Sequence, residues 1–404
     1  MKRIVLKFGG TSVGSITKIQ NVAKIIKKRY DDKNEIIVVV SAMSGTTNDL
    51  VKKSKLISSN FDKKELDVLL SSGEQVSSSL LSAAIIELGI KARSWLNWQI
   101  PIVTDDKYNA SQIINVQTKE ILKFISNRGV AVIPGFQGIS TENRTTTLGR
   151  GGSDLSAVVI AKFFKSDTCE IYTDVDGVLT TDPTINKKAK KIDKISYEEM
   201  LEMASLGAKV MQPTSVQAAM LENIPVHVKS TFSEKTGTII TSENEINYKK
   251  VVTGITYSKK NAKISIVGIV DKPGLAADVF EPLGENNVNI DMVIQNTSLD
   301  GKNANITFTI KKEDLKKTLN IIEKNKKKID YNKVTHDDKL SKVSIIGAGM
   351  IASPGVTYKM FRSLANEKIN ILAISTSEIK ISVLVNDNMT QKAVKALHKT
   401  FQLD

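Results

Sequence analysis

A repeated pattern near the C-terminal end is the feature that most limits what this chain can fold into. Residues 263–268, KISIVG, match residues 342–347, KVSIIG, about eighty residues further along. A proline-glycine pair follows each copy, at 273–274 and at 354–355, and begins a helical stretch. Strand patterns and a second helical pattern complete each copy. The repeat therefore predicts two α+β modules, each of β-α-β-β-α order.

Each copy of the repeat supplies only three strands to its module. The second copy ends with a helix near 389–400, and that helix runs almost to the last residue, Asp404. A fourth strand must therefore come from elsewhere in the chain. The stretch 251–258 is the best candidate, and its use would make one module discontinuous.

Residues 1–240 alternate short apolar strands with amphipathic helical patterns. This alternation predicts an α/β domain with a mainly parallel sheet covered by helices on both faces. The expected strands are 3–8, 36–41, 101–104, 130–134, 169–173 and 226–229.

Length supports two or three domains, because 404 residues are several times what one domain needs. We predict a catalytic domain at 1–240, a linker at 241–262 whose strand completes a module, and modules at 263–333 and 334–404. We expect catalysis in the large domain and regulation in the repeated modules.

Composition argues against a membrane-spanning protein, a secreted protein and a disulfide-bonded protein. Hydrophobic residues make up 41% and charged residues 25%, and no apolar run approaches the roughly 20 residues of a membrane helix. Lys7 and the glycines after it break the N-terminal apolar stretch, which argues against a secretion signal. The single cysteine, Cys169, excludes an intrachain disulfide and fits a reducing compartment. We expect a cytoplasmic protein.

The formal charge of +14 raises the question of nucleic-acid binding. The lysines are spread along the chain, with little arginine or aromatic interleaving, and a solvated surface explains them. We expect no nucleic-acid partner.

The first chemical motif is KFGGTSVGS at 7–15, between a strand and a helix. Glycines at such a turn let backbone N–H groups approach an anion, and the helix N-terminus and Lys7 add positive charge. The spacing matches neither the P-loop nor the dinucleotide fingerprint. A plain strand-to-helix turn would explain the glycines alone, but not the lysine.

The second motif is TTLGRGGSDLSA at 146–157, where glycines again precede a helix. Capping would explain Ser153 or Asp154, although Asp154 could also hold Mg²⁺. Capping would not explain Arg150 between two glycines, whose planar fork suits a carboxylate or a phosphate.

The third motif is TDVDGVLTTDP at 173–183, which places Asp174, Asp176 and Asp182 close together after a strand. Clustered carboxylates repel one another unless a cation or donors compensate, so a metal–nucleotide role competes here with an ordinary Asp-Gly turn.

Together with SAMSGTTNDL at 41–50, LSSGEQVSSS at 70–79, PGFQG at 134–138 and GAKVMQP at 207–213, these motifs closely resemble the aspartate kinases of the amino acid kinase family. The resemblance covers the whole chain, and the repeated modules resemble tandem ACT domains. It implies transfer of the γ-phosphoryl group of MgATP to the side-chain carboxylate of aspartate, the first step of lysine, threonine and methionine biosynthesis. An ionised carboxylate needs no general base. The three histidines, His227, His336 and His398, are accordingly read as structural or exposed.

The resemblance also implies roles for particular residues. Lys7 would stabilise the transferred phosphoryl group, Gly9 and Gly10 would supply backbone donors, and Asp154 would organise the lysine and the metal. The residues implied for the aspartate pocket are Ser41, Thr47, Glu74, Phe136, Arg150 and Ser153. Those implied for the nucleotide are Thr173, Asp174, Asp176 and Lys209.

In the modules, the resemblance implies an amino-acid effector, lysine or threonine or both, and a homodimer or a dimer of dimers. The implied effector contacts are Asp271, Gly274, Ala276, Asn289, Ile290, Asp291 and Gln295. Good turn chemistry would explain several of these residues equally well.

Three positions depart from the family pattern. Leu179 and Thr184 stand where many relatives have tyrosine and arginine, which leaves the adenine and phosphate contacts open, and Gln212 stands where many have histidine. These changes do not indicate loss of activity, because the residues for phosphoryl transfer remain. Two alternatives to an aspartate kinase stay open. One is a kinase for glutamate or a related acid, and the other is a catalytically silent amino-acid sensor or basic binding protein, against which the joint presence of Lys7, Arg150 and Asp154 argues.

Overall fold

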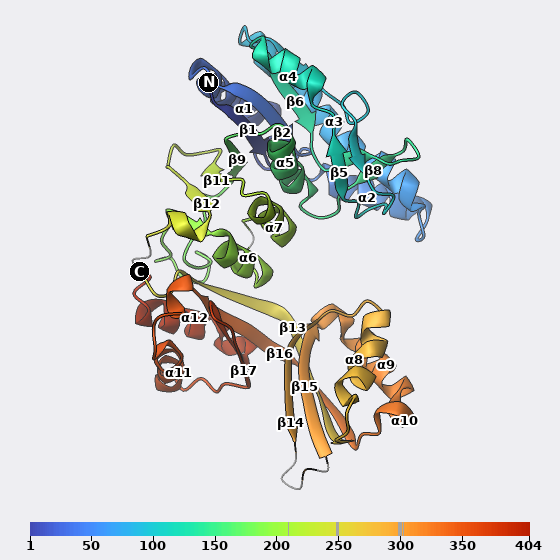
Figure 1. The fold of residues 1–404 in the computed structure, drawn as a ribbon, viewed down its shortest axis with the longest axis vertical. Coiled ribbons are helices and arrows are strands. Elements are labelled where there is room, and N and C mark those ends of the chain that lie inside the picture. Colours follow the sequence, from blue (N-terminus) through green and yellow to red (C-terminus); the bar gives the residue numbers. More distant parts are fainter. Residues whose placement is uncertain (209, 248–249, 298–300, 302) are drawn as a thin grey trace. The chain divides into compact units, whose positions relative to one another are not determined.

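The computed structural model describes residues 1–404 except 209, 248–249, 298–300 and 302 (Figure 1). The chain divides into two compact units. One consists of Met1–Thr180 and Lys190–Lys249, and the other of Thr181–Ala189 and Lys250–Asp404. Within the described residues, no helix combines the length and the apolar character that crossing a membrane requires.

The first unit is built on an eight-stranded, mainly parallel sheet, as the alternation of strands and helices predicted. Only the pair β11–β12 runs antiparallel. Strand β12 was not among the predicted strands. The strands in spatial order are β10 (Lys194–Ser196), β12 (Thr238–Thr241), β11 (Val226–Ser230), β9 (Thr168–Thr173), β1 (Arg3–Phe8), β2 (Glu35–Val40), β6 (Val130–Pro134) and β3 (Ala92–Ser94).

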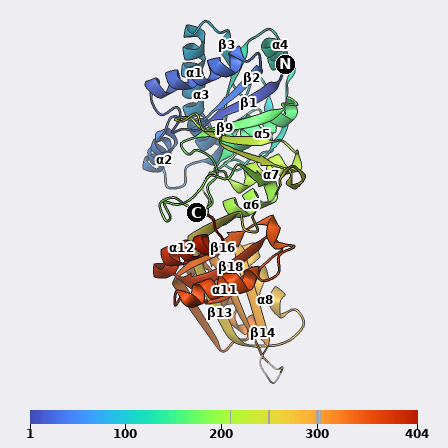
Figure 2. The same cartoon turned by 90° about the vertical axis from the view of Figure 1, so that its left-hand side faces the viewer.

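The central strands are buried on both faces, which explains their continuous apolar runs. Ile4, Leu6 and Phe8 of β1 share one core with buried residues of α1 (Ile16–Asp31) and α3 (Lys63–Glu87). Helix α5 (Gly152–Phe163) also packs on β1 (Figure 2). The other helices of this unit are α2 (Thr46–Ile57), α4 (Lys119–Ser126), α6 (Tyr197–Ser205) and α7 (Pro213–Leu221).

A second, small sheet in the same unit has four strands. The predicted strand at 101–104 belongs to this sheet and not to the large one. Strands of three or four residues carry too little periodicity for their sheet to be assigned from sequence. In spatial order they are β5 (Ile113–Val116), β4 (Ile102–Thr104), β7 (Gln137–Ile139) and β8 (Thr145–Thr147).

The second unit holds both modules in one six-stranded antiparallel sheet. Its two long strands are shared between the modules. The first part of β13, 254–258, pairs with 342–346 of β16, while the later part, 263–267, pairs with 333–337. Each module therefore has four strands, one of which comes from its neighbour. In spatial order the strands are β14 (Ile290–Thr297), β15 (Asn303–Lys311), β13 (Gly254–Val270), β16 (Lys333–Ile346), β18 (Lys380–Asn386) and β17 (Ala373–Thr376).

Each module has its own apolar core beneath its helices. The first core contains buried residues of α8 (Leu275–Glu285) and α9 (Leu315–Lys324), and the second contains those of α11 (Val356–Asn366) and α12 (Thr390–Thr400). A further short helix is α10 (Lys326–Ile329). The predicted boundary at 262 and 263 falls inside β13, because a strand shared by two modules has no break in its pattern.

Nine residues from within the predicted catalytic range 1–240 belong to the second unit, so that range is not one continuous domain. The physical reason is where their side chains pack. Ile185 lies against the core of the second module. The Tyr257 hydroxyl donates to Asp182 at 3.1 Å, and Lys188 forms an ion pair with Asp404 at 3.3 Å.

Candidate active site

A buried ion pair lies at the carboxyl end of β1. The Lys7 ammonium lies 2.5 Å from the Asp154 carboxylate, and each side chain is at most 13% exposed. Lys7 comes from the strand and Asp154 from the first turn of α5, so the pair joins the two glycine motifs of the sequence. Each charge is compensated by the other, as two largely buried charges require.

The two glycines of the turn after β1 differ in their hydrogen bonding. The Gly9 N–H donates to the Tyr172 carbonyl at 3.3 Å, and its role as a phosphate donor stays a prediction. The Gly10 N–H makes no hydrogen bond to a described residue. A Cβ atom on Gly10 would lie 2.8 Å from the Ala42 carbonyl, so this close approach requires glycine.

Arg150 lies on the turn between β8 and α5. The glycines on both sides have left-handed backbones, with φ of 74° at Gly149 and 76° at Gly151. A Cβ atom on Gly151 would meet the Gln212 side chain at 2.1 Å. This turn presents the Arg150 side chain to solvent, and no carboxylate among the described residues pairs with it. It is therefore a free cation at the edge of the site.

Glu74 is a buried carboxylate with one unsatisfied oxygen. It lies on α3 and is 4% exposed. Its Oε1 atom accepts the Ala42 N–H at 3.1 Å, whereas Oε2 is buried without a partner in the described chain. Burial raises the pKa of Glu74 to about 7, against the smaller opposing effect of the Ala42 hydrogen bond. A cationic group placed at Oε2 would restore the ionised form.

These groups share a hollow of about 730 Å³ in the first unit. Phe136, whose φ is 70°, enters it from the turn that follows β6. The hollow contains nine of the predicted residues, Lys7, Gly10, Ser41, Thr47, Glu74, Phe136, Arg150, Ser153 and Asp154. It also contains residues that the sequence analysis missed, among them Asn48, Leu70, Asn109 and Thr147.

The predicted nucleotide residues lie at the end of β9, outside the lining of this hollow. Because β9 and β1 are parallel neighbours, Thr173 and Asp174 lie at the same sheet edge as Lys7. Asp176 accepts hydrogen bonds from Lys235 and Ser233, both at 2.6 Å, and the Lys235 ammonium lowers the pKa of Asp176. Lys209 lies outside the described residues.

The third motif does not act as one acidic cluster. Asp176 is bound to groups of the first unit, whereas Asp182 belongs to the second unit and accepts the Tyr257 hydroxyl. Asp176 and Asp182 therefore have separate partners, each within its own unit. Apart from the omitted positions, the chain contains no group of three or more His, Cys, Asp or Glu residues that could hold a metal ion.

The histidines and the cysteine lie outside the hollow. His227 contacts the Thr236 carbonyl at 2.5 Å, and burial lowers its pKa. His398 is fully buried and pairs with Asp404 at 2.6 Å. Burial raises the pKa of the Cys169 thiol, which makes it a poor nucleophile.

The predicted effector residues gather around α8 and β14 of the first module. Gly274 caps α8 with φ of 92°, so turn geometry alone explains that glycine. Asp271 and Ala276 flank this cap, while Asn289, Ile290 and Gln295 lie at β14. Asp291 forms an ion pair with Lys342 of β16, whose side chain is 7% exposed. The Asp291 carboxylate is therefore already occupied by a cation.

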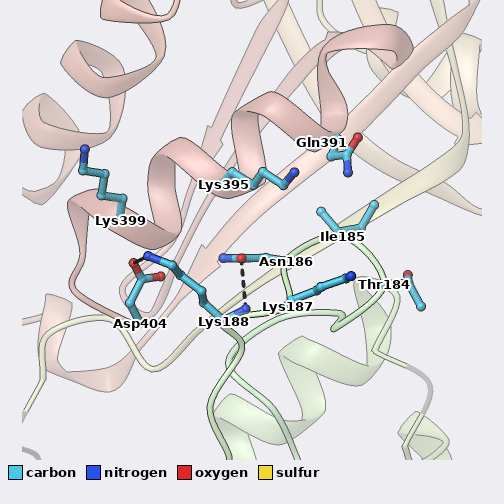
Figure 3. Close-up of a pocket in the computed structure, with 9 residues that line it drawn as sticks. All are labelled: Thr184, Ile185, Asn186, Lys187, Lys188, Gln391, Lys395, Lys399 and Asp404. Atoms are coloured by element: carbon cyan, nitrogen blue, oxygen red, sulfur yellow. Dashed lines mark hydrogen bonds and ion pairs between the residues drawn. The ribbon is translucent and has the colours of Figure 1, made fainter.

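The second unit contains another hollow, of about 440 Å³, between the 184–188 segment and α12 (Figure 3). Lys188 extends toward Asp404, whereas Lys399 points away from Asn186. The residues around this hollow are Thr184, Ile185, Asn186, Lys187, Lys188, Gln391, Lys395, Lys399 and Asp404.

Comparison with known proteins agrees with this architecture. Residues 2–230 match the amino acid kinase family, and residues 264–325 and 343–401 match the ACT domain. These matches define an enzyme class, the amino acid kinases that carry two ACT domains. The chain is 43% identical over 405 residues to aspartate kinase from Pseudomonas putida, which covers 100% of this chain and 98% of that protein. The chain belongs to the aspartate kinases.

Solved structures share the fold over the whole chain. Escherichia coli aspartokinase III in complex with aspartate and ADP has a TM-score of 0.82 at 24% identity, covering 99% of this chain and 100% of that one. Aspartate kinase from Clostridium acetobutylicum has a TM-score of 0.81 at 25% identity, with 98% and 100% covered.

Proposed function

We propose that this chain transfers the γ-phosphoryl group of MgATP to the side-chain carboxylate of L-aspartate, giving 4-phospho-L-aspartate. The observation that carries the proposal is the set of charges in the larger hollow. A buried Lys7–Asp154 pair lies beside Arg150, a cation without a partner, and Glu74, a buried carboxylate with one oxygen unsatisfied. An amino acid with two carboxylates and one ammonium complements these charges.

Arg150 and Glu74 would bind the acceptor and set its direction. The guanidinium would bind a carboxylate of aspartate through two parallel hydrogen bonds. The substrate ammonium would approach Oε2 of Glu74 and favour the ionised form of that carboxylate. The side-chain carboxylate of aspartate would then face the Lys7–Asp154 pair.

The chemical step needs no general base, because the attacking carboxylate is ionised at neutral pH. One of its oxygens forms the new bond to the γ-phosphorus. The bond from that phosphorus to the bridging oxygen breaks, and ADP leaves with the electron pair. The barrier comes from two anions approaching each other, so the Lys7 ammonium and the Gly10 N–H would lower it by neutralising the phosphoryl oxygens.

Mg²⁺ would enter with ATP and neutralise charge on the phosphates. Carboxylate oxygens are the ligands it prefers, and Asp154 offers one carboxylate in the hollow. Most of the coordination of the metal would come from the nucleotide phosphates. Thr173, Asp174 and Asp176 would position the nucleotide at the shared edge of β1 and β9, with Lys209 reaching its phosphates.

Regulation would belong to the two modules. We infer that lysine or threonine, or both, bind at α8 and β14 and inhibit the enzyme, which then serves the first step of lysine, threonine and methionine biosynthesis in the cytoplasm. We expect a homodimer or a dimer of dimers, and no nucleic-acid or membrane partner. An effector can inhibit only if it binds the less active arrangement more tightly.

The test is to incubate the protein with MgATP and single amino acids and to trap any acyl phosphate with hydroxylamine. We expect hydroxamate with aspartate and far less with glutamate. The Lys7→Met variant, which keeps a side chain of similar length without charge, is the matched control for chemistry at this site. Absence of hydroxamate with aspartate would contradict the proposal. Adding lysine or threonine to the same assay identifies the inhibitor.

A further inference from the structure

Asp67 is a buried carboxylate that the proposed mechanism does not use. It lies on α3, seven residues before Glu74, and its exposed fraction is 0%. Seven residues are about two helical turns, so both carboxylates are on one rigid helix. No lysine, arginine or histidine among the described residues forms an ion pair with Asp67. A buried carboxylate without a cation is costly unless hydrogen bonds satisfy it.

Three hydrogen bonds from two distant segments satisfy the Asp67 carboxylate. Oδ2 accepts the Asn109 N–H at 3.0 Å and the Thr147 N–H at 2.9 Å, and Oδ1 accepts the Thr147 hydroxyl at 2.6 Å. The two segments also bond to each other, because the Ser111 N–H donates to the Thr147 carbonyl at 2.9 Å. Burial raises the pKa of Asp67, and these three donors oppose that rise.

Both segments border the turn that presents Arg150. Thr147 is the last residue of β8, three positions before Arg150. Asn109 has φ of 68°, and its carbonyl lies where a Cβ atom on Gly149 would approach to 3.0 Å. Asn109 and Thr147 both line the larger hollow. The buried Asp67 carboxylate thus binds both segments that border the Arg150 turn.

We propose that Asp67 is a positioning residue that fixes the Arg150 turn relative to Glu74. Glu74 is carried by the same helix, so the bonds of Asp67 set the spacing between the two charged groups that receive the acceptor amino acid. This inference rests on the proposed function for the identity of that acceptor. A carboxylate suits the task because it accepts from three donors, whereas an asparagine has one acceptor oxygen and would turn its NH₂ group toward another donor.

Asp67→Asn tests the proposal by steady-state kinetics with each substrate varied in turn. We expect the KM for aspartate to rise about tenfold or more, because a shift near 1 Å in a positioning group has effects of that size. The KM for ATP should stay within about twofold, since no bond of Asp67 reaches β9 or the turn after β1. Thr147→Val removes only the hydroxyl bond. It should also raise the KM for aspartate and leave the KM for ATP unchanged, with a smaller rise than in Asp67→Asn.

Glu170→Gln is the matched control for a general loss of stability. Glu170 is 6% exposed and accepts hydrogen bonds from Arg29, Lys229 and Tyr172, and none of these four residues lines the larger hollow. We expect its variant to lower the unfolding temperature without changing the ratio of the two KM values. A merely structural role for Asp67 would give that same pattern and would overturn the proposal.

The outcomes separate this inference from the proposed function. Wild-type activity with aspartate tests the proposed function, whereas the split between the two KM values is measured with whichever acid the wild type phosphorylates. If folded Asp67→Asn or Thr147→Val protein has both KM values unchanged, or raises both together, Asp67 is not a positioning residue for the acceptor. If Asp67→Asn does not fold, the Thr147→Val result decides.

Discussion

The larger hollow and the hollow of the second unit both contain charged groups but differ in how those groups are held. In the first unit, Lys7 and Glu74 are less than one-tenth exposed, and Lys7 pairs with Asp154, whereas one oxygen of Glu74 has no partner among the described residues. In the second unit, Lys187, Lys395 and Lys399 are exposed and have no ion-pair partner among the described residues. Exposed lysines are solvated by water, whereas a buried unsatisfied carboxylate needs a ligand. A buried charged group that lacks a partner therefore indicates a binding site better than the number of charges in a hollow does.

The largest effect should follow removal of the Lys7 ammonium. Lys7→Met should lower kcat by about 10³-fold, because one preorganised donor at a reacting oxyanion contributes on that scale. The KM for aspartate should change little, because Arg150 and Glu74 remain. Rate measurements at saturating substrates check this. Activity within tenfold of wild type would mean that the buried pair with Asp154 is structural only.

Arg150→Gln should give the next largest effect, and this effect should be on the binding of aspartate. The variant loses the guanidinium fork but keeps a polar side chain, so we expect the KM for aspartate to rise about 100-fold. Because Arg150 is exposed and unpaired, the unfolding temperature should not change. Varying aspartate at fixed MgATP checks this. An equal rise in the KM for ATP would instead place Arg150 at the phosphates.

Glu74 should make the stability of the free protein depend on pH. Its folded pKa of about 7 lies above its ordinary value of 4.5, so the folded state binds more protons than the unfolded state between these pH values. The free energy of unfolding should therefore fall as pH rises from 4.5 to 7, by roughly 3 kcal/mol in total. Glu74→Gln should remove this contribution.

Denaturant unfolding of wild type and Glu74→Gln at several pH values measures this effect as a difference, which cancels the other titrating groups. At pH 8 without substrate the variant should be the more stable protein, although its KM for aspartate should be higher. Parallel pH curves for the two proteins would contradict the raised pKa.

The two glycine motifs show what local sequence could predict. Lys7, Gly10, Arg150 and Asp154 each belong to a short motif with a physical reason for its composition, and the structure brings all four into one hollow. The Gly9 N–H, predicted to be a phosphate donor, donates to the Tyr172 carbonyl in this structure. A neighbouring strand decides that bond, and the motif itself carries no information about it.

Contacts between distant residues explain what the sequence analysis missed. Asn109 and Thr147 enter the hollow because Asp67 binds them across 42 and 80 positions of the chain. A polar residue in a loop gives no sign of such a partner. The same reasoning applies to Ile185, which follows a catalytic-domain motif but packs in the second module. The sequence shows the periodic pattern of each strand and helix, but it does not show which distant residues each element will contact.

The smallest effect should come from changes in the hollow of the second unit, where the lysines are exposed. The double variant Lys395→Gln and Lys399→Gln removes two exposed charges of α12 without touching the ion pair between Lys188 and Asp404. Since exposed lysines without partners contribute little to stability, the free energy of unfolding should change by less than about 0.5 kcal/mol. The kcat and both KM values should stay within about twofold. If the KM for ATP rose several-fold instead, these lysines would bind phosphate groups, and a buried group without a partner would no longer be what separates the two hollows.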